Sequence, residues 1–206
     1  MSEEGRRERY DVYLVGVGGQ GVLTIADLIA EAAIEEGLDV NVYPTKGMAQ
    51  RGGSVKAQVR IGGGVMGPEI PERGADLVIA MERSEALKAV RYVKPAGEFL
   101  LFGRVWEPTK VMLGKADYPT PEEVRGQVER AGARWRYLDP AELPIHEGRA
   151  VPPNVYVLGA AVGGTTLGEV LDGDRVAEVV ASRWERYATV NEKAFRAGLE
   201  ADVDGE

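Results

Sequence analysis

A short glycine-rich run near the amino terminus has the spacing of a phosphate-binding turn. Gly16-Val-Gly-Gly-Gln-Gly21 fits the pattern G-x-G-x-x-G and lies between an apolar stretch at 12–15 and an amphipathic pattern that begins at Val22. Glycine permits a tight turn and a close backbone approach, and the free N–H groups at a helix start attract anions. The alternative is that the glycines only let the helix pack closely on the sheet. The candidate cofactor-binding residues in this loop are Gly16, Gly18, Gly19, Gln20 and Gly21.

A second loop, rich in cations and glycines, follows the next predicted strand at 39–43. Carboxyl ends of parallel strands are where open α/β sheets bind ligands. No carboxylate stands there to hold the ribose of NAD, whereas Lys46 favours an additional phosphate, as on NADP or on the 3′-phosphate of coenzyme A. A solvated surface loop is the alternative. The candidate cofactor-binding residues here are Lys46, Gly47, Met48, Gln50, Arg51, Gly52 and Gly53.

The first part of the chain predicts a βαβ unit. A short apolar strand at 12–15 is followed by the glycine turn, by an amphipathic helix that ends at Gly37, and by the strand at 39–43, so residues 10–43 suit a right-handed crossover. Residues 54–61 alternate apolar and polar side chains, which is typical of a strand with one wet face that is antiparallel or at a sheet edge.

The rest of the chain predicts more strands and then helices only. We expect strands at 77–80, 98–102, 110–113 and 135–138, a short helix at 84–90 and a helix that begins at Pro121. Asn154, Asp174 and Thr189 resemble the caps of three further helices. The fold class is therefore α/β and Rossmann-like, with a mostly parallel sheet, helices on both faces and a helical C-terminal segment. We expect a single domain over residues 1–206, with the α/β core at 10–140 and the C-terminal helices at 154–200.

Composition excludes several classes of protein. The net charge of −8 opposes binding to nucleic acid. The charged opening leaves no room for a signal peptide, and no later stretch is apolar enough to span a membrane, which suggests a cytoplasmic protein. The chain has no cysteine, so any iron–sulfur cluster must belong to another chain.

The two loops together resemble the gamma-type domain of pyruvate and related 2-oxoacid:ferredoxin or flavodoxin oxidoreductases. The run at 16–21 and the run Gly-Met-Ala-Gln-Arg-Gly-Gly-Ser-Val at 47–55 look like the signatures of that family, and the block at 75–80 is similar to its next one. The blocks around Asn154 and Asn191 follow these runs in the same order as in that family. Within the family, the chain looks most like the beta subunit of indolepyruvate ferredoxin oxidoreductase.

The resemblance implies an enzyme complex in which this chain is one part. Such enzymes decarboxylate a 2-oxoacid with thiamine diphosphate, pass electrons through iron–sulfur clusters to ferredoxin, and deliver the acyl group to coenzyme A. A large alpha subunit would carry thiamine diphosphate, Mg and the 4Fe-4S clusters, since the thiamine signature Gly-Asp-Gly…Asn does not occur here. This chain, inactive alone and without an assigned catalytic residue, would position coenzyme A at the subunit interface. Lys46 and Arg51 would neutralise phosphate, and Gln50 would form a hydrogen bond with the substrate or cofactor. The alternative for Arg51 is that it is an interface residue.

Several alternatives remain open from the sequence. A pyruvate, 2-oxoglutarate or branched-chain 2-oxoacid enzyme is possible within the family; outside it, a stand-alone NADP-dependent oxidoreductase or a non-catalytic nucleotide-binding domain would use the same glycine loop. His146 is the only histidine, so we expect a surface residue and no multi-histidine metal site. Glu82 could belong to the site or stabilise a helix start. We expect packing or interface roles for Trp106, Trp135 and Trp184.

Overall fold

The computed structural model of the chain describes residues 9–46, 53–63, 67, 69–105 and 118–203. Its main sheet has six strands in the order β2-β3-β1-β4-β5-β6, and a separate hairpin pairs β7 with β8. The strands are β1 (Tyr10–Val17), β2 (Val40–Lys46), β3 (Ser54–Ile61), β4 (Ala75–Ala80), β5 (Val93–Phe102), β6 (Arg134–Leu138), β7 (Ile145–His146) and β8 (Arg149–Ala150). The α-helices are α1 (Val22–Glu35), α2 (Arg83–Ala89), α4 (Pro121–Arg130), α5 (Pro153–Gly164), α6 (Gly173–Arg183) and α7 (Ala188–Leu199).

The sheet is mostly parallel, with one antiparallel strand inserted in it. β1, β4, β5 and β6 pair in parallel, whereas β3 runs antiparallel between β1 and β2. The prediction that residues 54–61 form an antiparallel strand is confirmed, but the strand lies inside the sheet and β2 takes the edge. The predicted βαβ unit at 10–43 is correct in its order of elements; its two strands, however, are separated by β3 instead of lying side by side.

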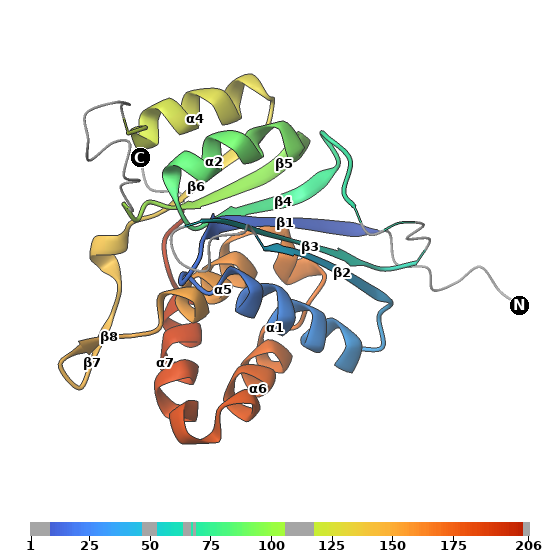
Figure 1. Cartoon of the computed structure of the whole chain (residues 1–206). Helices are drawn as coiled ribbons and strands as arrows, with labels where there is room; N and C mark the ends of the chain where they lie inside the picture. Colours follow the sequence, from blue (N-terminus) through green and yellow to red (C-terminus); the bar gives the residue numbers. More distant parts are fainter. Residues whose placement is uncertain (1–8, 47–52, 64–66, 68, 106–117, 204–206) are drawn as a thin grey trace, which may run out of the picture.

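Helices cover both faces of the sheet, as the sequence predicts (Figure 1). β1 shows why, because Val12 and Leu14 belong to the core beneath α1 and the C-terminal helices, while Tyr13 and Val15 belong to a second core beneath α2 and α4. Successive side chains of a strand point to opposite faces, so a strand that is apolar throughout must be covered twice.

The expectation that one face of the strand at 54–61 is exposed to solvent is wrong for the second half of β3. Gln58 and Arg60 are buried, and both have partners. The Arg60 guanidinium donates to the Asp11 carboxylate at 3.0 and 3.2 Å, and the Gln58 side-chain oxygen accepts from the backbone N–H of Ile70 at 2.5 Å. Burial of these polar groups is tolerated because each is hydrogen-bonded.

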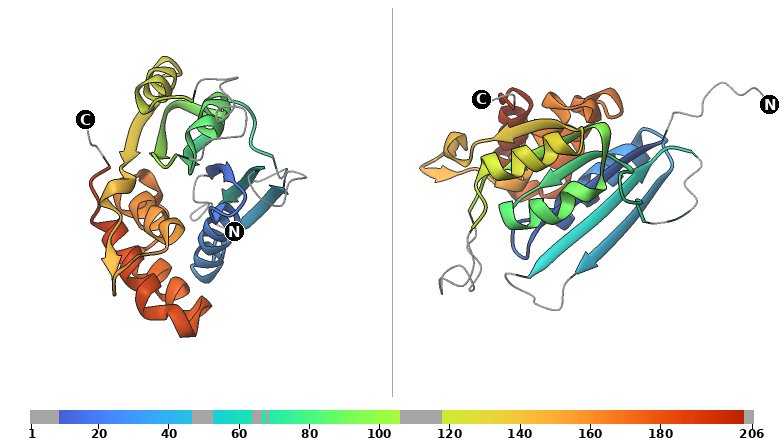
Figure 2. Two further views of the ribbon diagram at one scale, coloured as in Figure 1. Left: turned by 60° about the vertical axis from the view of Figure 1, so that its left-hand side comes forward. Right: turned by 90° about the horizontal axis from the view of Figure 1, so that it is seen from above.

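The helical C-terminal segment packs beside α1 on one side of the sheet (Figures 1 and 2). α5 and α7 approach very closely at glycines on both helices. A Cβ atom at Gly159 would lie 2.1 Å from the carbonyl oxygen of Phe195, and one at Gly198 would lie 2.1 Å from that of Tyr156. Any side chain at either position would therefore force the two helices apart, which explains why glycine stands at both.

The three predicted C-terminal helices exist, but their predicted caps are wrong. α6 is capped by Asp172, whose carboxylate accepts from the N–H groups of Asp174 and Arg175. α5 begins after Pro152 and α7 after Tyr187, and neither has a side-chain cap. Asn154 and Thr189 lie inside the first turns, where their side chains do not cap the helices.

Candidate functional site

The glycine loop joins β1 to α1 at the carboxyl edge of the sheet. A Cβ atom at Gly16 would lie 2.7–2.9 Å from Gln20, Val22 and Met81, and one at Gly21 would lie 2.7–2.8 Å from the side chain of Asn154. Close packing therefore requires glycine at these two positions, as the alternative interpretation of the loop proposes. Gly19 is different, because its φ is +102° and no atom of the described residues lies within 4 Å of its Cβ position.

The side chain of Gln20 fixes the loop between two strands. Its oxygen accepts from the N–H of Val17 at 2.9 Å, and its nitrogen donates to the carbonyl oxygen of Met81, just after β4, at 2.9 Å. Gln20 therefore ties the end of β1 to the end of β4. This role holds the loop in shape whether or not a ligand is bound.

The structure brings the ends of the two predicted loops together. Lys46 at the end of β2 lies opposite Val55, which in turn lies opposite Gly16. The N–H of Gly18 donates to the carbonyl oxygen of Gly53 at 2.9 Å. The remaining candidates of the second loop, Gly47, Met48, Gln50, Arg51 and Gly52, lie outside the described residues, as do Trp106 and the predicted strand at 110–113.

Two buried carboxylates of α2 stabilise this edge, and sequence reasoning identified only one of them. Glu82 accepts from the N–H groups of Ser84 and Glu85 at 3.0 and 2.8 Å and from the Tyr118 hydroxyl, so it is a helix cap and not a free acid. Glu85, which the sequence analysis did not single out, accepts from the hydroxyl of Ser54 at 2.7 Å. The end of the second loop is thus attached to both the glycine loop and α2.

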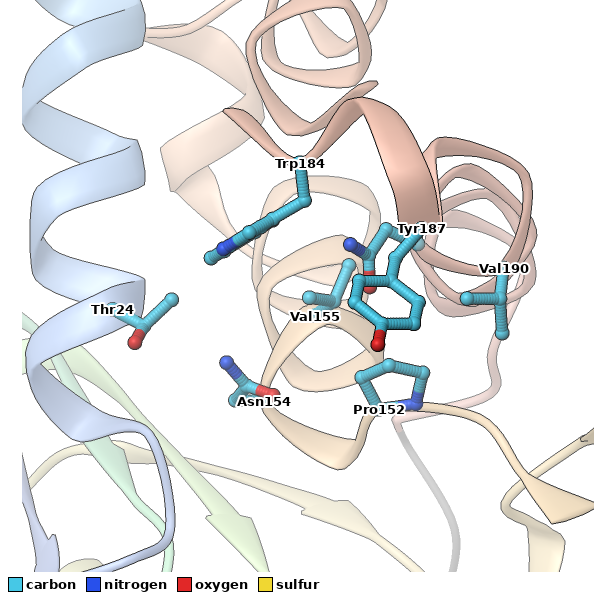
Figure 3. Close-up of a pocket in the computed structure, with 8 residues that line it drawn as sticks. Thr24, Pro152, Asn154, Val155, Trp184, Tyr187 and Val190 are labelled. Atoms are coloured by element: carbon cyan, nitrogen blue, oxygen red, sulfur yellow. The ribbon is translucent and has the colours of Figure 1, made fainter. Parts of the chain in front are cut away.

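A cavity of about 300 Å³ opens beside the glycine loop (Figure 3). Asn154, whose side chain packs on Gly21, forms part of its wall, and the indole of Trp184 and the ring of Tyr187 form other parts. The sequence analysis named Asn154 as a helix cap and as part of the family resemblance, and Trp184 as a packing or interface residue, but it placed neither at a cavity. The cavity is lined by Thr24, Pro152, Asn154, Val155, Trp184, Tyr187, Val190 and Asn191.

The other residues singled out from the sequence have structural surroundings. The ring of Trp135 stacks on that of Phe99, at a centroid distance of 6.4 Å, and on that of Tyr137, at 6.1 Å. These contacts confirm its packing role. His146 is partly exposed and lies 3.3 Å from the Lys193 amine, in agreement with a surface position. Within the described ranges, no group of three or more His, Cys, Asp or Glu side chains could hold a metal ion, and no helix is long and apolar enough to cross a bilayer.

At the opposite edge of the sheet, Glu98 joins β5 to the C-terminal helices. Its carboxylate accepts from the N–H and hydroxyl of Thr166 at 2.7 and 2.8 Å and from the guanidinium of Arg136 at 3.1 Å. Burial alone would raise the pKa of this carboxyl, but these donors and the charge of Arg134 outweigh it and hold the pKa below its ordinary value. The group is therefore a stabilising anion, remote from the glycine loop.

Comparison with known proteins first defines the class of fold. A pyruvate oxidoreductase subunit, PORC, from Thermotoga maritima superposes with a TM-score of 0.70 at 21% sequence identity, over 94% of this chain and 97% of that one. A 2-oxoglutarate:ferredoxin oxidoreductase from Magnetococcus marinus, solved with 2-oxoglutarate, coenzyme A and succinyl-CoA bound, superposes with a TM-score of 0.62 at 18% identity; the match covers 93% of this chain and 30% of that one. The fold is thus found both as a separate subunit and as part of a longer chain.

The sequence comparison then gives the family. Residues 11–201 match the family pyruvate ferredoxin/flavodoxin oxidoreductase, and the chain belongs to that family. The indolepyruvate oxidoreductase subunit IorB of Pyrococcus horikoshii is 37% identical over 196 residues, which cover 94% of this chain and 96% of that subunit. The resemblance inferred from the two loops is confirmed, and it extends along nearly the whole chain.

Proposed function

We propose that the chain is the small subunit of a cytoplasmic 2-oxoacid:ferredoxin oxidoreductase that oxidatively decarboxylates an arylpyruvate, most directly indolepyruvate, to its acyl-CoA. The observation that carries the proposal is the 37% identity to subunit IorB over nearly the full length of both chains. A large alpha subunit is the partner, and ferredoxin accepts the electrons. Thiamine diphosphate with Mg supplies the decarboxylation chemistry on that partner, which also holds the 4Fe-4S clusters.

The role proposed for this chain is to hold coenzyme A at the subunit interface. α1 has no side-chain cap and no acidic residue in its first turn, so the positive end of its dipole is uncompensated. Gly19, at the tip of the loop before α1, leaves open space around its Cα. A phosphate can approach the helix start from that side. Lys46 and Arg51 supply countercharge from the second loop, whose end at Gly53 is bonded to Gly18.

The assignment of coenzyme A contacts is tested by Arg51→Ala in the assembled complex. Because the guanidinium would neutralise a phosphate, the KM for coenzyme A should rise about ten- to hundredfold, as expected when a charge-assisted hydrogen bond worth roughly 1.5–3 kcal/mol is lost. Arg125→Ala, on the exposed surface of α4, is the matched control and should leave the KM unchanged. Weaker assembly with an unchanged KM would instead make Arg51 an interface residue.

The substrate class is tested by comparing kcat/KM for several 2-oxoacids with the same complex. Indolepyruvate and phenylpyruvate should exceed pyruvate, 2-oxoglutarate and 3-methyl-2-oxobutanoate. A preference for any of the last three would overturn the arylpyruvate assignment and leave the family assignment intact.

A further inference from the structure

The starts of three helices meet at the cavity lined by Thr24, Asn154 and Asn191. Thr24 belongs to the first turn of α1, Asn154 to that of α5, and Asn191 follows the first turn of α7. None of these three helices has a side-chain cap or an acidic residue in its first turn. In contrast, α2, α4 and α6 are each capped by a side chain and carry acidic residues there. The helix starts without a compensating negative charge at this cavity are therefore those of α1 and α5, because α7 continues directly from a 3₁₀ turn whose first turn carries Glu185.

The side chain of Asn191 gives independent support for a ligand. The residue is only 5% exposed, it lines the cavity, and among the described residues its side-chain amide has no hydrogen-bond partner. Buried side-chain amides are otherwise almost always paired, so this one is available to a molecule that enters the cavity.

The remaining wall is apolar and aromatic. Figure 3 shows the indole of Trp184 and the side chain of Asn154 between Thr24 on one side and the ring of Tyr187, beside Pro152, on the other. Pro152, Val155 and Val190 complete the apolar part, and none of the described residues that line the cavity is charged. Such a surface suits a flat apolar body, because aromatic side chains stack on rings.

The approach to the cavity is lined by cations. An adjoining hollow of about 700 Å³ shares Pro152, Tyr187 and Val190 with the cavity. Two arginines, Arg149 and Arg186, belong to its lining together with one carboxylate, that of Glu147. The arginine side chains are exposed and attract an anion at this place on a chain whose net charge is −8.

We propose that this cavity binds a small aromatic carboxylate. The carboxylate accepts hydrogen bonds from the amide of Asn191 and from the hydroxyl of Thr24, at the positive ends of the helices, and the ring lies against Trp184. Binding here goes beyond the positioning of coenzyme A and requires neither the partner subunit nor turnover.

Isothermal titration of the full chain with phenylacetate, phenylacetamide and acetate tests the proposal. Phenylacetate should bind at least tenfold more tightly than phenylacetamide, which lacks the charge, and than acetate, which lacks the ring. Equal affinities for phenylacetate and phenylacetamide would show that no anion is recognised, and absence of binding would remove the site. Either result overturns the proposal without bearing on the activity of the complex.

Asn191→Asp supplies the matched variant, because it places a negative charge where the carboxylate should bind. The affinity for phenylacetate should fall at least tenfold, whereas Asn41→Asp, the same change on the edge strand β2, should have no effect. If circular dichroism shows that Asn191→Asp does not fold, Thr24→Val is the second variant, because it removes a hydrogen-bond donor on a different helix. The ratio of the affinity for phenylacetate to that for phenylacetamide should then fall at least threefold. An unchanged preference in a folded variant would contradict the proposal.

Discussion

Replacing Gly21 by alanine tests whether the glycine loop is held by its contact with the C-terminal helices. Gly21 has a φ of +78°, and a Cβ atom there would lie 2.7–2.8 Å from the side chain of Asn154 at the start of α5. Gly37, at the end of α1, has almost the same φ of +74°, but nothing lies within 4 Å of its Cβ position. The two positions therefore share the backbone strain and differ in the contact.

The expected magnitudes follow from these two terms. A left-handed conformation costs an L-residue roughly 1–2 kcal/mol, and the reduced freedom of the unfolded chain returns about 0.4–1 kcal/mol, so Gly37→Ala should lower the free energy of unfolding by about 1 kcal/mol. Overlap with a packed side chain adds roughly 1–3 kcal/mol, so Gly21→Ala should lower it by about 2–4 kcal/mol.

Urea unfolding of the two variants, followed by circular dichroism, measures the difference between them. A loss of stability in Gly21→Ala that is no larger than in Gly37→Ala would refute the reasoning. It would mean that Asn154 moves aside at no cost, and that Gly21 is needed only for its backbone conformation.

Three other perturbations have definite outcomes. Gln20→Leu leaves two backbone groups without their partners and should lower the free energy of unfolding by about 2 kcal/mol, measured by urea unfolding; a loss below about 0.5 kcal/mol would show that the bonds between the strand ends do not matter. Glu98→Gln should cost about 1–3 kcal/mol at pH 7. Because the folded-state pKa of Glu98 is lowered, that contribution is complete above the unfolded-state pKa of about 4.3 and is lost as the pH falls through the folded-state pKa. The difference between this variant and the wild type should thus shrink in unfolding experiments below about pH 4, whereas a constant difference would contradict the ionic account. Gly198→Ala should separate α5 from α7 and lower the thermal unfolding midpoint. Gly126→Ala, on the outer helix α4, should not lower it, because alanine favours a helix more than glycine does and, among the described residues, only the Arg130 side chain lies within 4 Å of the Cβ position.

The sequence predicted most elements of the described fold because their patterns are local. The apolar run in β1, the glycine turn and the period of α1 each depend on a few neighbouring residues. The position of β3 between β1 and β2 does not, since it follows from pairing between segments that are far apart in the chain. That residues 1–206 form a single domain stays a prediction.

The burial of the polar side chains of β3 could not be predicted either, because it also depends on segments that are far apart in the chain. Gln58 and Arg60 look like one wet face when only their own strand is considered. Their burial depends on Asp11 in another strand and on backbone groups of Gly67, Glu69 and Ile70. Polar side chains that alternate with apolar ones therefore indicate a strand, but they do not by themselves show that the polar face is exposed to solvent.

The candidate site was predictable in its loops but not in its cavity. The glycines, Lys46 and the residues up to Gly53 form two continuous motifs, and the structure joins the ends of both. The cavity instead takes its lining from α1, from the start of α5 and from residues 184–191. No local pattern links these segments, so Asn191 could be identified as a ligand candidate only after its burial and its lack of a partner were known.

The central claim, that this chain is one subunit of an indolepyruvate:ferredoxin oxidoreductase, is tested most directly by reconstitution. The measurement is reduction of a low-potential viologen dye by indolepyruvate and coenzyme A with this chain alone, with its large partner alone, and with both together. We predict turnover only in the mixture. Failure of the two chains to associate, or full activity of the large partner without this chain, would contradict the account.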